Sequence, residues 1–268
     1  ASNRACTAMG NLSTASGEVS TAMGYDTTAG GMTSTAMGEG TTASNRACTA
    51  MGYQTEATAD YSTAMGMQTT AGGKFSTAMG MQTSATAKWS TSMGRLTSAG
   101  GEASTAMGYG TTANGEASTA MGSGTQATSD FCTAMGFSTK ATQPRSTAMG
   151  HSTTASAWYS TAMGRNTIAS GNTSTAMGLH TTADGLASTA MGYRTTATGQ
   201  YSTVIGKWND VDDAIFIVGT GDADNNRSDA LIIDNDGTTT IPVSLYVGDH
   251  GLSVSSSENA LVEGITLE

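Results

Sequence analysis

The chain has 268 residues, 35 glycines, 17 methionines and only 12% charged residues, and its net charge is −10. Residues 1–206 hold nine acidic and nine basic side chains, whereas residues 207–268 hold twelve acidic and two basic ones. This pattern has no basic stripe for a phosphate backbone and no apolar run that could span a bilayer, so we expect neither nucleic-acid binding nor membrane insertion of this segment.

Residues 1–206 form a tandem array with a period of 14. Methionine stands at every fourteenth position from Met9 to Met191, and Ile205 takes the next position. Each unit reads S-T-A-M-G-x-x-T-T-A-x-G-x-x. Its invariant residues are the Thr two residues before Met, the Gly directly after Met and the Ala six residues after Met. A helical repeat needs about 30 residues, and Gly, Ser and Thr disfavour helix. The period therefore predicts an all-β fold, a parallel β-roll or β-solenoid of fifteen 14-residue coils.

Within each coil we expect two short strands, S-T-A-M-G and x-T-T-A-x, joined by turns that contain Gly. In the first strand, alternation places Thr and Met on one face, and Ser, Ala and Gly on the other. We expect the small, flat face to pack against copies of the same chain; the alternative is a lone solenoid whose small residues fit a narrow interior. We expect the repeat core to consist of the methionines, represented by Met23, Met65, Met107, Met149 and Met191.

The unit STAMGYGTTANGEAS resembles the head repeat of trimeric autotransporter adhesins of the YadA type, whose S-V-A-I-G-x-x-A-x-A-x-G-x-x unit has the same length and the same Ala and Gly positions. Met replaces the family's Ile or Val, Thr often replaces Val, and residues 202–206 nearly restore the family form. The resemblance covers residues 1–206. It implies a left-handed homotrimeric β-roll in an extracellular adhesive fibre, on a bacterial surface, a virion or a phage tail, with a protein or glycan receptor as its other partner.

Residues 207–268 follow a different pattern. Apolar alternating runs at 214–218, 230–233 and 241–247 are separated by Asp, Asn and Gly, which predicts short strands and turns. Residues 214–241 resemble segments that follow such head repeats in phage tail fibres and large bacterial surface proteins. The resemblance implies an acidic, β-rich cap and connector towards a stalk, and a solenoid needs such a cap because its last coil exposes unpaired strand edges.

Aromatic side chains occupy the variable positions of the unit, just after Gly and just before Ser. Their period predicts stripes on the outside of the rod, and exposed aromatic side chains beside Lys and Arg are typical of binding surfaces. The alternative is that they cover turns and pack on neighbours one coil away. The candidate binding surface comprises Tyr61, Phe75, Trp89, Phe131, Trp158, Tyr159 and Tyr201.

No pattern in the chain predicts catalysis, a metal or a cofactor, so we expect a non-enzymatic protein. Cys6, Cys48 and Cys132 take the Ser position of the unit, and coils that hold them lie at least about 14 Å apart, too far for an intrachain disulfide. The histidines have no ligand-like spacing, and the Asp- and Asn-rich stretches 222–226 and 234–237 do not match a calcium loop. We interpret the cysteines as packing residues and these stretches as turns.

The alternative function is ice binding. Thr recurs two residues before Met and four and five residues after it, which predicts regular rows of hydroxyl and methyl groups on a flat solenoid. Glu56, Gln126, Lys140 and Ile168 interrupt the last of these rows. Ice binding requires an outward-facing, unbroken Thr sheet.

Overall fold

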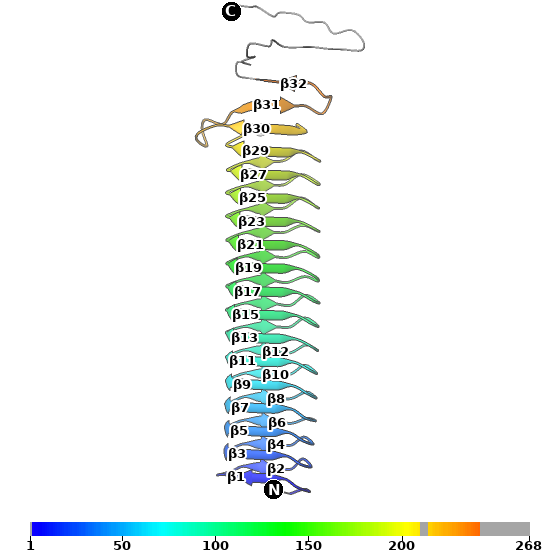
Figure 1. Cartoon of the computed structure of the whole chain (residues 1–268), viewed down its shortest axis with the longest axis vertical. Helices are drawn as coiled ribbons and strands as arrows, with labels where there is room; N and C mark the ends of the chain where they lie inside the picture. The colour runs from blue at the N-terminus through cyan, green and yellow to red at the C-terminus, as the bar shows by residue number, and fades with distance from the viewer. Residues whose placement is uncertain (1, 210–213, 242–268) are drawn as a thin grey trace, which may run out of the picture.

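The computed structural model of the chain describes residues 2–209 and 214–241 (Figure 1). The chain is a rod-shaped parallel β-solenoid in which each 14-residue coil lies on the one before it. The described residues contain strands and turns and no helix. This architecture confirms the all-β solenoid of fifteen coils predicted from the period.

Each coil contributes a long strand to one sheet, and each coil except the last contributes a short strand to a second sheet. Partners on successive long strands are 14 residues apart, so Thr21 lies beside Thr35 and Met23 beside Met37. The long strands are β1 (Thr7–Met9), β3 (Thr21–Tyr25), β5 (Thr35–Glu39), β7 (Thr49–Tyr53), β9 (Thr63–Met67), β11 (Thr77–Met81), β13 (Thr91–Arg95), β15 (Thr105–Tyr109), β17 (Thr119–Ser123), β19 (Thr133–Phe137), β21 (Thr147–His151), β23 (Thr161–Arg165), β25 (Thr175–Leu179), β27 (Thr189–Tyr193) and β29 (Thr203–Lys207). The short strands are β2 (Thr14–Ala15), β4 (Thr28–Ala29), β6 (Thr42–Ala43), β8 (Glu56–Ala57), β10 (Thr70–Ala71), β12 (Ser84–Ala85), β14 (Ser98–Ala99), β16 (Thr112–Ala113), β18 (Gln126–Ala127), β20 (Lys140–Ala141), β22 (Thr154–Ala155), β24 (Ile168–Ala169), β26 (Thr182–Ala183) and β28 (Thr196–Ala197).

The interior of the roll is filled by small side chains from both sheets. In the coil that contains β3 and β4, Ser20, Ala22, Thr27 and Ala29 are fully buried. Met23 and its counterparts in the other coils lie on the outer face of the long-strand sheet and are only partly covered. Our expectation that the small, flat face packs against copies of the chain is therefore wrong, because this face fills the narrow interior of its own roll.

The placement of the methionines corrects our expectation that they form the repeat core. Met23, Met65, Met107, Met149 and Met191 share their outer face with Thr, as the alternation predicted, but the opposite face points inward. The reason is the volume between the two sheets. In the array the largest fully buried side chain is Thr, and larger ones such as Val204 and Ile217 are buried only from the last coil onward.

The Gly after each Met is required by the close stacking of the coils. These glycines have a positive φ, which is 120° at Gly108. A Cβ atom on Gly108 would lie 2.0 Å from the carbonyl oxygen of Gly122 in the next coil. Any side chain at this position would therefore both strain the backbone and push two coils apart.

The C-terminal segment first continues the stacking and then ends it. Strand β30 (Phe216–Thr220) pairs in parallel with β29, whereas β31 (Asp229–Ile233) and β32 (Thr239–Thr240) are antiparallel to their neighbours. Two of the three strands expected after residue 206 are thus present, within two residues of the predicted bounds. The third expected run, 241–247, lies outside the described residues apart from Ile241.

Candidate binding surfaces

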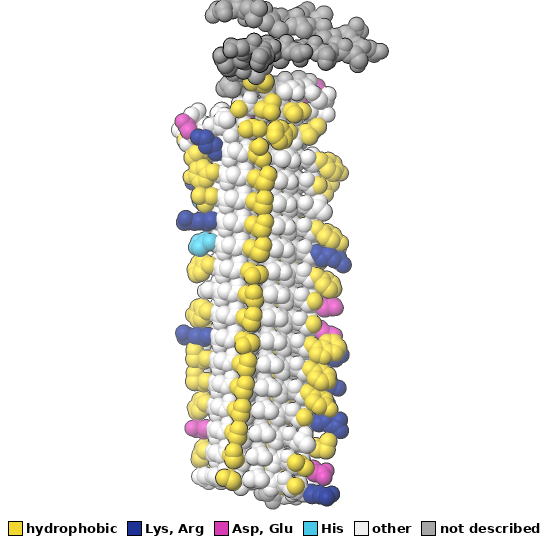
Figure 2. Space-filling model, viewed as in Figure 1, with side chains coloured by type: hydrophobic (Ala, Val, Ile, Leu, Met, Phe, Trp, Pro, Cys, Tyr) yellow, Lys and Arg dark blue, Asp and Glu magenta, His cyan; other side chains and the backbone are white. Residues whose placement is uncertain are grey.

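An apolar stripe runs along the outer face of the long-strand sheet for the whole length of the rod (Figure 2). The methionines of fourteen consecutive coils form it, and Ile205, Val218 and Leu231 extend it across the last strands, each beside its neighbour in register. The larger members, Phe216 and Ile233, widen the stripe at the C-terminal end. A monomeric soluble protein rarely exposes a continuous apolar surface of this length, so the stripe is a candidate interface.

A column of fifteen threonines lies beside the stripe, from Thr7 to Thr203, and it faces outward without interruption. The Thr column four residues after Met is instead buried inside the roll, as Thr69 and Thr111 illustrate. The column five residues after Met faces outward but is interrupted by several other residues. The structure therefore has one of the outward Thr rows that ice binding requires, but it has no broad Thr sheet among the described residues.

The seven aromatic residues of the candidate binding surface lie at the turns that precede the long strands, which we term the turn edge. They are 41% to 66% exposed. Six of them occupy the position four residues before Met, where the backbone has φ near 60°. Bulky side chains are uncommon in this left-handed region, because the Cβ atom crowds the following carbonyl group. The backbone needs this conformation in every coil because its N–H pairs with the coil before it, as Tyr61 does with the Arg46 carbonyl at 2.9 Å.

Three of these residues form a ladder of stacked rings. The ring centroids of Tyr61 and Phe75 are 5.0 Å apart, and those of Phe75 and Trp89 are 6.5 Å apart, with nearly parallel planes. The ammonium groups of Lys74 and Lys88 lie 5.3 Å and 3.5 Å from the Phe75 and Trp89 ring centroids. Such stacking and cation–π contacts offset part of the backbone strain and cover the ring faces.

A second aromatic group begins three coils beyond Trp89 on the same edge. The guanidinium group of Arg145 lies between the rings of Phe131 and Tyr159, 5.5 Å and 5.3 Å from their centroids. It also donates a hydrogen bond to the Tyr159 hydroxyl at 3.1 Å. Packing on neighbours one coil away, the alternative that we considered, therefore applies to both groups. Their ring edges remain exposed.

Trp158 and Tyr201 differ from the other aromatic residues of the turn edge, because among the described residues neither makes a ring-stacking or cation–π contact. Tyr201 is also the most exposed of the seven, at 66%. It lines a hollow of about 600 Å³ together with Thr198, Gln200 and Asn235. This hollow lies where the last coil of the array meets the turn between β31 and β32.

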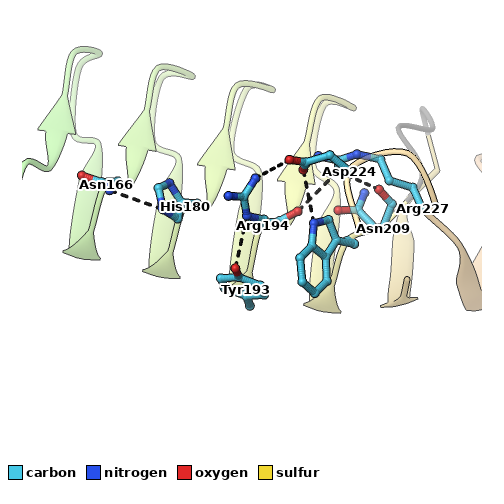
Figure 3. A network of polar contacts seen from close by, with 8 residues as sticks. Asn166, His180, Tyr193, Arg194, Asn209, Asp224 and Arg227 are labelled. Carbon is cyan, nitrogen blue, oxygen red and sulfur yellow. Dashed lines mark hydrogen bonds and ion pairs between the residues drawn. The ribbon is translucent and has the colours of Figure 1, made fainter. Parts of the chain in front are cut away.

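The opposite edge of the rod, formed by the bends after the long strands, carries a polar network at its C-terminal end (Figure 3). Asp224 forms salt bridges with Arg194 and Arg227 and accepts a hydrogen bond from the Trp208 indole at 3.2 Å. Desolvation opposes ionisation of Asp224, but the hydrogen bond and charge of Arg194 outweigh it and lower the pKa of this carboxyl group. Trp208 also packs edge-on against Tyr193, at a centroid distance of 4.5 Å. The network fastens the segment after β30 to the last coils.

Asn209 terminates the short-strand sheet. Its side-chain amide accepts a hydrogen bond from the Thr196 N–H at 2.7 Å and donates one to the Thr196 carbonyl at 2.9 Å. It thus replaces the backbone partners that a further coil would supply to β28. Sequence reasoning missed both Asn209 and Asp224, because neither residue belongs to a repeat; only the expectation of a cap pointed to this region.

The cysteines have the same role as the serines that they replace. The Sγ atoms of Cys48 and Cys132 donate to the carbonyl groups three residues earlier, at 2.8 Å and 2.7 Å, as Ser20 does at 2.6 Å. All three cysteines are free, and burial raises the pKa of the Cys48 and Cys132 thiols. These contacts agree with our interpretation of the cysteines as packing residues.

Neither the histidines nor the acidic turns are arranged as a ligand cluster in the described part of the chain. His151 stacks on Phe137, and His180 lies 3.4 Å from the Asn166 amide one coil away. Asp222 accepts from Asn226, which fits its interpretation as a turn residue. No group of three metal-ligating side chains occurs among the described residues. This part of the chain also has no helix long and apolar enough to cross a membrane. His250 lies outside the described residues.

Comparison with known families gives one match. The model for the YadA head domain repeat (2 copies) matches residues 7–27, 49–69, 62–83, 99–131, 133–153, 155–181 and 183–207. These ranges cover more than half of the chain and fall within the array of stacked coils. No curated protein matches the chain. YadA-type heads are structural, surface-exposed adhesin domains that form homotrimers. The repeat, the β-solenoid and the family match lead to one conclusion: this chain belongs to the YadA head repeat family.

Proposed function

We propose that the chain is the head segment of an extracellular adhesive fibre, in which three copies associate through their apolar stripes. The observation that carries the proposal is the continuous Met stripe on the outside of a roll whose own interior is already full. Membership in the YadA head family supports the trimer and the adhesive role. In this arrangement residues 207–268 cap the roll and connect it to the rest of the fibre.

The stripe has enough apolar surface to hold the copies together. Full burial of a Met side chain contributes about 1.5–3 kcal/mol, and each Met is already partly covered, so about 1 kcal/mol remains per coil and per chain. Over fifteen coils this amounts to about 15 kcal/mol per chain, which is comparable to or larger than the cost of about 4–15 kcal/mol for association. The Thr column beside the stripe adds methyl groups to the same face.

Adhesion in this proposal comes from the two edges of the rod, where the exposed aromatic and charged side chains lie (Figure 2). The roll acts as a stiff support and needs no catalytic residues, metal or cofactor. A trimer carries three copies of each edge, so several weak contacts with a protein or glycan receptor can form at once and give tight overall binding. We place the fibre on a bacterial surface, a virion or a phage tail, as the family and the resemblance of residues 214–241 suggest.

The first test is the mass of the chain in solution, measured by light scattering after gel filtration. A trimer has about three times the 26.9 kDa of one chain. Met107→Glu places a charge in the middle of the stripe and should release folded single chains. Ile168→Glu is the matched control, because Ile168 is an exposed apolar residue on the outer face of the other sheet. A folded wild-type monomer would refute the trimer.

Ice binding remains a second candidate, favoured by one observation, the unbroken outward column of fifteen threonines. It requires this face to be open to water, so it and the trimer exclude each other. Freezing hysteresis that disappears in a Thr105→Tyr variant of a monomeric chain would support ice binding. Its absence in a chain of trimeric mass would exclude it. We favour the adhesin because the column lies alone beside Met and the other outward Thr column is interrupted.

A further inference from the structure

The exposed rings of the turn edge differ in whether their flat faces can receive a ligand. In the ladder of Tyr61, Phe75 and Trp89 the rings cover one another, and Lys88 lies over Trp89 at 3.5 Å. In the second group the guanidinium of Arg145 occupies the space between Phe131 and Tyr159. Each of these rings uses at least one face in the packing of the rod.

Among the six turn-edge rings on residues with φ near 60°, Tyr201 alone makes no ring-stacking or cation–π contact with the described residues. The preceding coil has Ala187 at the same position, so no ring stacks on Tyr201 from that side. Tyr201 has a φ of 61°, a conformation that is unfavourable for a bulky residue, and it lacks the stacking that accompanies this strain in the ladder. Ala occupies this position in several coils, so the fold itself does not need an aromatic residue there.

The hollow beside Tyr201 has the chemistry of a sugar subsite. Its volume of about 600 Å³ falls in the range of small-molecule pockets. The ring of Tyr201 offers an apolar face, against which the C–H groups of a pyranose can pack. The side-chain amide of Gln200 and the hydroxyl of Thr198 can each donate and accept hydrogen bonds, and sugar hydroxyls need both.

We propose that this hollow, at the junction of the roll and its cap, binds a ring of a neutral glycan. The residues that line it, Thr198, Gln200, Tyr201 and Asn235, carry no charge. Asp234 and Asp236 flank Asn235 in the chain, so the local field disfavours sialylated or sulfated sugars. The inference rests on the proposed adhesive function and assigns its receptor class. In a trimer the site occurs three times.

A second hollow on the described surface is less suited to this role. It is lined by Gly40, Gln54, Glu56, Gln68 and Thr70 and contains no aromatic residue. The Gln68 amide already donates to Gln54 at 3.2 Å. It therefore lacks the apolar face that the Tyr201 hollow offers, and part of its own hydrogen-bonding capacity is already used.

The test uses the labelled full chain on a printed panel of neutral, sialylated and sulfated oligosaccharides. We expect binding to neutral glycans, an at least tenfold loss of apparent affinity in Tyr201→Ala, and a change of less than twofold in Ile168→Ala, which alters an exposed side chain on the outer face of the short-strand sheet. Ala is tolerated at the position of Tyr201 in other coils, so Tyr201→Ala should fold, and thermal unfolding of both variants checks this. Asn235→Asp adds a charge without changing size and should also weaken binding at least severalfold.

Several outcomes would overturn the inference and leave the adhesive function intact. One is loss of glycan binding in Tyr61→Ala but not in Tyr201→Ala, which would place the site on the ladder. Another is a preference for sialylated or sulfated glycans. A third is adhesion to cells or immobilised proteins without binding to any neutral glycan on the panel. Failure of the full chain to adhere to any surface would instead refute the proposed function itself.

Discussion

Most of the buried threonine hydroxyls in one column inside the roll have no hydrogen-bond partner among the described residues. Eleven threonines four residues after Met are in this state, including Thr83. Thr97 in the next coil differs, because its hydroxyl lies 2.7 Å from that of Ser92. Ser92 stands beside Ala78 in the sheet, at a position where the other coils have Ala, or Val204 in the last coil. The two adjacent coils therefore differ in whether the Thr hydroxyl is satisfied.

Replacing these threonines by valine should have opposite effects in the two coils. A buried polar group without a partner costs about 1–3 kcal/mol, and valine has nearly the shape of threonine without the hydroxyl. We expect Thr83→Val to raise the free energy of unfolding by about 1–2 kcal/mol. Thr97→Val removes the hydrogen bond and leaves the Ser92 hydroxyl unsatisfied, so it should lower the free energy of unfolding by about 1–3 kcal/mol.

Guanidinium unfolding, followed by circular dichroism at one fixed protein concentration, measures both effects. The transition midpoint should move in opposite directions, with an unchanged denaturant slope. The double variant Ser92→Ala with Thr97→Val removes both partners and should recover most of the stability lost in Thr97→Val, a coupling that a double-mutant cycle isolates. Destabilisation by Thr83→Val equal to that by Thr97→Val would refute the reasoning, because the hydroxyl of Thr83 would then have a partner.

Three further predictions concern the stacking, the thiols and the cap. Gly108→Ala should expose the surrounding coils to hydrogen exchange, because its Cβ would lie 2.0 Å from a carbonyl oxygen, whereas Gly110→Ala, with open space around it, should cost only about 1 kcal/mol. Because burial raises the pKa of the Cys48 and Cys132 thiols, they should resist labelling at pH 8 in the folded state, and the stability that they contribute should decrease as pH rises above the thiol pKa of the unfolded chain. Asp224→Asn changes the acceptor of the Trp208 indole N–H, so it should shift the tryptophan fluorescence and speed hydrogen exchange in the segment after β30. Because the pKa of Asp224 is lowered in the folded chain, its contribution to stability should persist at pH 4 and be lost as pH falls below the ordinary value of 3.8.

Each of these predictions has a clear opposite result. Equal protection from exchange in the two glycine variants would show that the coils are not stacked closely enough for the clash. Rapid labelling of all three thiols in the folded chain would contradict burial of two of them. An unchanged exchange pattern after Asp224→Asn would show that the network does not fasten the segment after β30.

The sequence alone determined the repeating part of this fold. A strict period of 14 with a Gly in every unit sets the coil length and aligns each strand with its neighbour, because backbone hydrogen bonds between parallel strands need only a constant step. The same alternation correctly grouped Thr with Met and Ala with Gly. The repeat also predicted that the aromatic residues lie at exposed turns, because its variable positions between two strands can only lie at the edges of the roll.

The tertiary structure decided which of the two faces points inward. A pattern of alternation is symmetric with respect to the two faces, and the choice depends on the width between the sheets, which closure of the whole coil sets. That width admits Ala22 and Thr27 but not Met23, so the larger apolar side chains form an outer stripe. The ring contacts, the Asn209 amide that ends the short-strand sheet and the hollow beside Tyr201 were equally beyond prediction from the sequence. Each of them joins residues from different coils or from the cap, and no local pattern encodes such a meeting.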